Sequence, residues 1–246
     1  MIIGSNLVFC ENLTSTNKQA SELLKKNDIP EGTVVHSDFQ TAGRGQPGNR
    51  WESEKGRNLL ISVILYPGSV KPHEQFLISM TISLGICDFI DRHLPGSKVK
   101  WPNDIYVKDD KIAGVLIENS IMGDSIENTV AGIGLNINQE EFPDEIRNPV
   151  SLKMLTQKEY SRNICLNDLL SDLDKRYKLL LYGDRNSIRN EYVSRLYRFN
   201  EQHKYKAGKR TFTGRITDVS VSGILSITEE NGKTSRFSFK EVHFLL

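Results

Sequence analysis

Short apolar runs separated by turn residues fill the stretch from residue 98 to residue 138, and they constrain the fold more than any other feature. The predicted strands are Lys98–Trp101, Ile105–Val107, Ile112–Glu118 and Ile126–Asn138. Consecutive strands are separated by only a few residues, such as Lys108–Lys111, which is typical of hairpins. We therefore expect this region to form a largely antiparallel sheet.

Helical patterns lie on both sides of this region. Phe76, Met80, Leu84 and Cys87 recur at helical spacing within Pro72–Arg92, so we predict a helix whose apolar stripe belongs to the core. Other helices are predicted over 18–26, 151–155, 163–181 and 187–199, and other strands over 7–9, 32–37 and 58–66. The predicted class is α+β, with a mixed, largely antiparallel sheet packed on helices.

The pattern changes near Asn200, where we place the boundary between a domain of residues 1–199 and a domain of residues 200–246. Three short strands follow at regular spacing, Thr211–Val219, Gly223–Glu229 and Ser235–Phe239. Asn231-Gly232, between the last two strands, is a strong signal for a hairpin turn. Short, closely spaced strands of this kind predict a small β-barrel.

Composition limits the functional classes. Lys and Arg number 32 against 31 Asp and Glu, and this balance does not indicate nucleic-acid or membrane binding. Cys10, Cys87 and Cys165 are scattered and form no CxxC pair, which argues against a zinc site or a disulfide framework. We expect a reduced, cytoplasmic setting, with neither a signal peptide nor an apolar stretch long enough to span a membrane.

The most unusual loop is Gln40–Trp51, which lies between two predicted strands. Its glycines allow tight turns and close approach of the backbone to a ligand. Arg44 and Arg50 add positive charge, and Trp51 adds a flat apolar face. This combination suits an anionic ligand, for example one that carries a nucleotide. An ordinary glycine-rich surface loop is the alternative.

Polar side chains near the start of the chain form a second candidate group. The hydroxyl of Ser15 or Thr16 is expected to cap the following helix. A second, compatible interpretation is that these hydroxyls and the Asn17 amide bind a neutral polar ligand. Gly132 and Gly134 interrupt a predicted strand, and glycine in a strand often marks close approach by a ligand or another backbone.

The turn that follows Lys100 carries the third group. The amide of Asn103 and the carboxylate of Asp104 suit hydrated Mg²⁺ together with a ribose or phosphate, although a ligand-free turn is the alternative. Lys111 begins the next strand and points either into a pocket or into solvent. The sequence has no Ser/His/Asp signature and no P-loop, so any activation of a ligand is expected to rely on placed cations.

Taken together and in this order, these stretches resemble biotin protein ligases. The resemblance spans about Thr14–Asn138 and rests on Ser15-Thr16-Asn17, Gln40 with Gly43-Arg44-Gly45, Trp51, Lys100-Trp101-Pro102-Asn103-Asp104, Lys111-Ile112-Ala113-Gly114 and Gly132–Asn138. It implies a class II synthetase-like ligase core, and the C-terminal β-domain resembles the family's SH3-like module. It also implies two steps: biotin and MgATP form biotinyl-5′-AMP, and a lysine of a biotin carboxyl carrier protein then displaces AMP.

The resemblance also implies roles for individual residues. Lys111 and Arg44 are expected to be the catalytic cations that offset the repulsion between carboxylate and phosphate. The residues expected to bind biotin are Ser15, Thr16, Asn17, Gln40, Gly43, Arg44, Gly45, Gln46, Lys111 and Gly114. The residues expected to bind ATP or the adenylate are Trp51, Lys100, Asn103, Asp104 and Asn136, with Asp104 as the candidate Mg²⁺ ligand.

The chain departs from the common family pattern in two ways. Gln46, Pro47 and Asn49 stand at three positions that are usually arginine, so the loop is expected to retain the adenylate with fewer charges. The first motif begins at Thr14, so we expect a monofunctional enzyme without the N-terminal DNA-binding domain of bifunctional members. The rival interpretations are a lipoate or octanoate ligase and a non-catalytic biotin-sensing module. A homodimer is left open, because unpaired strand edges invite pairing.

Overall fold

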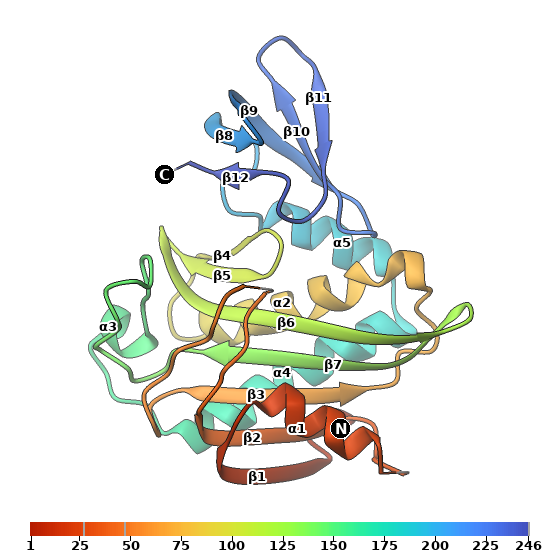
Figure 1. Ribbon diagram of the computed structural model, residues 1–246, viewed down its shortest axis with the longest axis vertical. Helices are drawn as coiled ribbons and strands as arrows, with labels where there is room; N and C mark the ends of the chain where they lie inside the picture. Colours follow the sequence, from red (N-terminus) through yellow and green to blue (C-terminus); the bar gives the residue numbers. More distant parts are fainter. Residues whose placement is uncertain (27, 47, 246) are drawn as a thin grey trace.

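A seven-stranded sheet lies at the centre of the larger part of the protein (Figure 1). The computed structural model describes residues 1–26, 28–46 and 48–245. The strands are β1 (Asn6–Leu13), β2 (Thr33–Gln40), β3 (Leu59–Leu65), β4 (Ser97–Lys100), β5 (Asp104–Val107), β6 (Asp110–Met122) and β7 (Ser125–Leu135), in the spatial order β1-β2-β3-β7-β6-β5-β4. β1 and β2 are parallel and the other neighbours are antiparallel, which confirms the predicted mixed, largely antiparallel sheet.

Helices cover both faces of this sheet. They are α1 (Thr16–Leu24), the short 3-10 helix η1 (Pro72–Glu74), α2 (Phe76–Asp91), α3 (Leu152–Thr156), α4 (Arg162–Tyr182) and α5 (Arg185–Ser194). α1 packs with Val35 and Ile64 on one face, whereas Val34 and Val63 on the other face belong to the main core with α2 and α4. Because both faces are covered, every residue of β3 is buried, which explains its nearly continuous apolar sequence.

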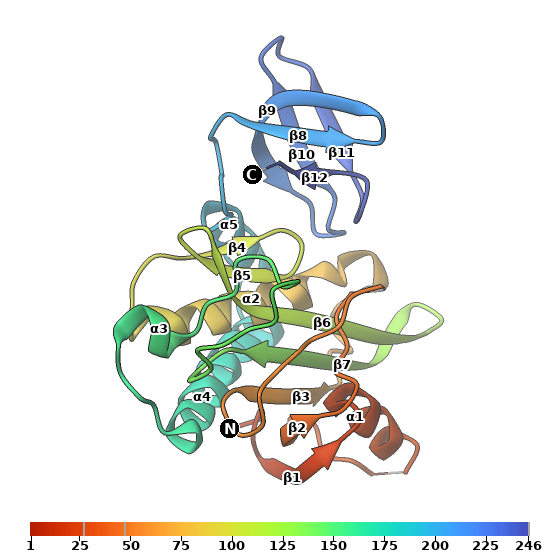
Figure 2. The same cartoon turned by 60° about the vertical axis from the view of Figure 1, so that its left-hand side comes forward.

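A separate five-stranded antiparallel sheet forms the C-terminal part, above the larger sheet in Figures 1 and 2. Its strands are β8 (His203–Ala207), β9 (Arg210–Val219), β10 (Leu225–Glu229), β11 (Thr234–Phe237) and β12 (His243–Phe244), in the order β11-β10-β9-β8-β12. Gly232 has a φ of +81°, as the predicted Asn231-Gly232 turn requires. The predicted C-terminal strands are thus confirmed as a separate antiparallel sheet, whereas the closed barrel and the domain boundary at residue 199 stay predictions.

The prediction that the last large helix extends to Phe199 is wrong, because α5 ends at Ser194. The backbone beyond it pairs with β4: the Val99 N–H donates to the Arg195 carbonyl (2.9 Å), and the Tyr197 N–H donates to the Val99 carbonyl (2.8 Å). Arg198 and Asn200 have φ values of +62° and +59°, which no helix accommodates. Tertiary pairing with β4 therefore replaces the last helical turn.

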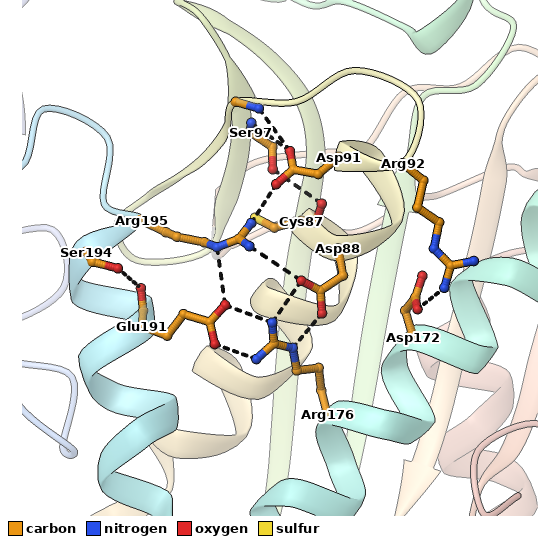
Figure 3. Close-up of polar contacts among 11 residues, drawn as sticks. Cys87, Asp88, Asp91, Arg92, Ser97, Asp172, Arg176, Glu191, Ser194 and Arg195 are labelled. Atoms are coloured by element: carbon orange, nitrogen blue, oxygen red, sulfur yellow. Dashed lines mark hydrogen bonds and ion pairs between the residues drawn. The ribbon is translucent and has the colours of Figure 1, made fainter.

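A polar cluster connects α2, α4 and α5 with the start of β4 (Figure 3). Arg176 of α4 bonds Asp88 of α2 and Glu191 of α5, with both Glu191 bonds at 2.6–2.8 Å. Arg195 donates to Asp91 (2.7 Å), whose carboxylate also accepts from the Ser97 N–H (3.0 Å). These ion pairs are partly buried and form one network, because Arg176 bonds two carboxylates at once. The network fixes the helices that support the β4–β5 turn.

The indole of Trp101 joins the two sheets. Its N–H donates to the Gly223 carbonyl at 3.0 Å, and its ring packs on Phe239 with centroids 5.4 Å apart. A Cβ at Gly223, where φ is +88°, would lie only 3.0 Å from the rings of Phe239 and Phe76. The Lys100–Asp104 motif is therefore held in place by the C-terminal sheet as well as by its own strands. No helix within the described residues has the length and apolar character needed to cross a membrane.

Candidate active site

A cavity of about 990 Å³ lies between the larger sheet and the C-terminal segment. The predicted site residues that line it are Ser15, Thr16, Asn17, Gln40, Arg44, Gly45, Gln46, Trp51, Lys100, Asn103, Asp104, Lys111 and Gly114. Gly43 and Asn136 are predicted site residues that do not line it. The fold thus brings together side chains from motifs that are separated by up to about a hundred positions in the sequence.

The N-terminus of α1 contributes hydroxyl groups to one end of the cavity. Ser15 occupies the N-cap position but makes no side-chain capping bond. Gln40 at the end of β2 takes that role, since its Oε1 accepts from the Thr16 N–H (2.7 Å) and hydroxyl (3.1 Å). The predicted capping by Ser15 or Thr16 is therefore wrong, and the Ser15 hydroxyl, without a hydrogen bond among the described residues, is free to bind a ligand.

Asn17 and Arg44 are connected through Glu118, which the sequence analysis did not select. Glu118 Oε2 accepts from Asn17 Nδ2 (2.7 Å) and from Arg44 Nη2 (2.6 Å), while Asn17 Oδ1 accepts from Ser62 Oγ (2.6 Å). A Cβ at Gly132 would lie 2.1 Å from Asn17 Oδ1, so the glycine makes room for the amide. Asn17 is thus held mainly by the protein. A lone acidic residue in a predicted strand was the only signal for Glu118.

Two strand glycines form a flat floor for the Trp51 indole. A Cβ at Gly134 would lie 2.2 Å from the ring, and a Cβ at Gly114 would lie 3.0 Å from it. The two glycines face each other across β6 and β7. The indole N–H of Trp51 is buried and finds no hydrogen-bond acceptor among the described residues. Both glycines are explained by close approach, as the strand pattern indicated.

The loop that carries Arg44 is a tight hairpin. The backbone N–H of Trp51 donates to the Gly43 carbonyl (3.1 Å), and the backbone N–H of Gly45 donates to the Asn49 carbonyl (3.1 Å). A Cβ at Gly43 would lie 2.3 Å from the Trp51 carbonyl oxygen, so Gly43 shapes the hairpin and does not reach the cavity. The adjoining Pro47, which the sequence analysis expected to stiffen the loop, lies outside the described residues.

Lys111 and Asp104 form an ion pair of 2.7 Å at the other end of the cavity. Asp104 is the only acidic side chain that lines the cavity within residues 1–26, 28–46 and 48–245. The same residues contain no group of three or more His, Cys, Asp and Glu side chains that could hold a metal ion. One carboxylate fits Mg²⁺ only when phosphate oxygens and water complete its coordination, so the site suits Mg²⁺ that arrives with a nucleotide.

Lys100 and Asn103 flank this ion pair but have partners of their own. Lys100 Nζ donates to the Tyr106 hydroxyl (2.8 Å) and lies 5.7 Å from the centre of the Phe244 ring. Burial lowers the pKa of Lys100, although the negative charge of Asp104 opposes this shift. Asn103 Nδ2 donates to the Val115 carbonyl, which ties the turn to β6.

Asn136 does not line the cavity but supports the segments around it through hydrogen bonds. Its Nδ2 donates to the Val150 carbonyl (3.0 Å), its N–H donates to the Ile112 carbonyl (2.9 Å), and its Oδ1 is buried without a partner among the described residues. Further residues that no motif predicted also line the cavity, namely Arg147 and the C-terminal residues Phe239, Lys240, Val242, His243, Phe244 and Leu245. No local pattern marks them, because tertiary packing brings them there.

The cavity has two chemically different ends along the same pair of strands. Asn17 marks the hydroxyl and amide end beside Gly132, and Lys111 marks the cationic end beside Gly114, which faces Gly134, and beside Trp51. Two residues along a strand separate these ends by about 7 Å. Such a site can hold a neutral polar ring at one end and bring its carboxylate to a phosphate at the other.

Comparison with known proteins agrees with this geometry. The bifunctional ligase/repressor BirA of Bacillus subtilis is 29% identical over 237 residues, which cover 94% of this chain and 72% of the relative. The human biotin–protein ligase is 30% identical over 182 residues, 72% of this chain and 22% of that protein. The structure of the Aquifex aeolicus biotin protein ligase in complex with biotin and ATP matches with a TM-score of 0.79 and 26% identity, over 98% of this chain and 100% of that one.

The family model agrees with these relatives in the part of the chain that it covers. Residues 9–136, which include the Arg44 loop, the Lys100–Asp104 turn and Lys111, match the model of the Biotin/lipoate A/B protein ligase family. This stretch is more than half of the chain and contains all residues that line the cavity except Arg147 and the C-terminal residues. The protein belongs to the Biotin/lipoate A/B protein ligase family.

Proposed function

We propose that the protein is an ATP-dependent biotin protein ligase, which activates biotin and transfers it to a lysine of a carrier protein. The observation that carries this proposal is the cavity that joins the Ser15–Asn17 end to the Lys111 end. Biotin has a neutral ureido ring and a carboxylate, which match a hydroxyl-lined and a cationic end, respectively. The human relative named above is a biotin–protein ligase, and the Aquifex aeolicus structure is a biotin protein ligase in complex with biotin and ATP.

In the first step a carboxylate oxygen of biotin attacks the α-phosphorus of ATP. The new P–O bond forms biotinyl-5′-AMP, and the bond to the β-phosphate breaks to release pyrophosphate. Two anions must approach each other, and at 4 Å they repel by about 4 kcal/mol at an effective dielectric constant of 20. In this proposal Lys111 neutralises the reacting group, and the Arg44 guanidinium leaves Glu118 to contact the same group from the hairpin. Both cations line the cavity, which supports these roles.

In the second step the neutral ε-amine of the carrier lysine attacks the acyl carbon of the adenylate. The C–O bond breaks, AMP leaves, and the amine loses a proton as the amide forms. Trp51 is proposed to pack on the adenine, because its indole lies flat in the cavity with an unpartnered N–H. The Asp104 carboxylate would hold Mg²⁺ that accompanies ATP, and the ion would neutralise charge on the phosphates.

The proposed partner is the biotin carboxyl carrier domain of a carboxylase, and the proposed setting is the cytoplasm. Cys10, Cys87 and Cys165 are free thiols, which suits a reducing compartment. Asn103 and Asn136 are proposed to act mainly by holding the turn and the Val150 segment around the nucleotide, since protein carbonyls accept from both amides.

The test is mass spectrometry of a purified biotin carboxyl carrier domain after incubation with the protein, MgATP and biotin. A parallel tube receives lipoate in place of biotin, and a third contains the Lys111→Ala variant with biotin. A biotin-sized mass gain in the first tube alone is the expected result. A gain with lipoate alone would reassign the chain to lipoate ligation. No gain, with biotin binding still measurable by calorimetry, would point to a sensing module.

A further inference from the structure

The positive charge of the cavity greatly exceeds its negative charge. Six Lys or Arg side chains line it, against Asp104 as the single acidic one among the described residues. Two of the cations are already paired, Arg44 with Glu118 and Lys111 with Asp104. Like charges that converge without counter-ions repel one another, and binding of an anion removes that cost. An unpaired cation in this cavity is therefore a candidate for anion binding.

Arg147 is such a cation. It lines the cavity from the segment that follows β7, and its side chain is exposed. The structure records no hydrogen bond or ion pair of its guanidinium with any residue of the described ranges 1–26, 28–46 and 48–245. A guanidinium presents paired N–H donors that match phosphate oxygens, so Arg147 has its full donor capacity available to a ligand.

The backbone beside Arg147 is tied to the catalytic strand. The Lys111 N–H donates to the Asn148 carbonyl (2.7 Å), the Val150 N–H donates to the Lys111 carbonyl (3.0 Å), and the Asn148 amide donates to the Asp109 carbonyl. Arg147 therefore projects from a fixed point next to Lys111. Burial is the main cause of the lowered pKa of Lys100, and the positive charge of Arg147 lowers this pKa further. Arg147 is therefore close enough to repel the Lys100 ammonium.

We propose that Arg147 binds the phosphates of ATP that leave as pyrophosphate, while Lys111 serves the α-phosphate. This proposal rests on the proposed function. It explains how the chain manages with Gln46 and Asn49 in the hairpin, because a cation from a different segment takes over part of the phosphate binding. Binding that involves only the leaving phosphates should affect ATP and pyrophosphate and leave biotin unchanged.

The test compares Arg147→Ala and Arg147→Lys with the wild-type protein, and Arg215→Ala is the matched control. Arg215 is an exposed arginine on β9 that does not line the cavity. Calorimetry measures the Kd for inorganic pyrophosphate, and carrier biotinylation measures KM for ATP and for biotin. We expect both the pyrophosphate Kd and the KM for ATP to rise about tenfold in Arg147→Ala, less in Arg147→Lys, and not in Arg215→Ala.

The results that would contradict the role of Arg147 differ from those that would contradict the proposed function. A pyrophosphate Kd and a KM for ATP that both stay within about twofold of wild type would overturn the role of Arg147, as would an equal rise in the KM for biotin. If Arg147→Ala fails to fold, as judged by circular dichroism, Arg147→Lys and its pyrophosphate Kd decide. If the wild-type protein does not biotinylate the carrier, the proposed function fails, and the pyrophosphate titration still tests Arg147.

Discussion

Substitution of Gly134 by alanine should impair nucleotide binding through the displaced Trp51 ring. The new Cβ would lie 2.2 Å from the Trp51 ring, whereas ordinary contact begins near 3.4 Å. The backbone of Gly134 cannot retreat, because β7 is held between β3 and β6 at Leu60 and Gly114. The indole must therefore move by about 1.2 Å, the difference between those two distances. Overpacking of this kind typically costs about 1–3 kcal/mol of stability, and less where a loop yields.

The consequence for catalysis follows from the displaced ring. A shift of about 1 Å in a positioning group can reduce a rate about a hundredfold. We expect the KM for ATP, measured by biotin-dependent ATP–pyrophosphate exchange, to rise between about tenfold and a hundredfold. Tryptophan emission should shift to longer wavelength, because Trp51 becomes more exposed while Trp101 stays buried.

Two glycines provide graded controls. A Cβ at Gly114 would meet the Trp51 ring at the milder distance of 3.0 Å, so Gly114→Ala should have a smaller effect. A Cβ at Gly68 would meet nothing within 4 Å, so Gly68→Ala should match the wild type. The reasoning would be refuted by a Gly134→Ala protein whose KM for ATP and emission spectrum equal those of Gly68→Ala.

Three further predictions concern single side chains. Lys111→Met should slow adenylate formation by about 10²–10³-fold in single-turnover experiments, and a loss below about tenfold would contradict its role as the cation at the reacting phosphate. Gln46→Arg should slow dissociation of biotinyl-5′-AMP by about tenfold, because it adds a charge to the hairpin; an unchanged rate would count against this. Burial lowers the pKa of His93 from 6.5, so the folded state holds fewer protons than the unfolded one. The stability that His93 contributes above about pH 6.5 is lost as the pH falls through the lower folded-state pKa. His93→Phe keeps an aromatic ring against Phe89 and Tyr160 but cannot be protonated. In urea unfolding between about pH 7 and pH 5, this variant should therefore lose less stability than the wild type.

Most of the elements could be predicted from sequence because their signals are local. The continuous apolar run of β3 corresponds to a fully buried strand, and the helical stripe of α2 corresponds to a helix that is buried except at Asp88 and Asp91. Strands β8 and β12 were missed, since β8 buries only Tyr205 and β12 is two residues long, so neither has an apolar pattern to detect. The motifs around Arg44, Trp51 and Lys111 were readable as ligand-binding stretches because glycine, proline and charged residues in such combinations are uncommon in ordinary loops.

The sequence by itself determined the mixed α+β class, the C-terminal β-domain and most residues around the cavity, since periodicity and turn chemistry act over a few positions. Tertiary structure alone decided which groups have partners. Asn17 is held by Glu118, 101 positions away, and Gln40 in place of Ser15 bonds the start of α1. Strand register and the packing of the two sheets set such contacts, and they also bring Arg147 and the C-terminal segment to the cavity. The physical reason is that packing around a common core joins residues that no local sequence pattern connects.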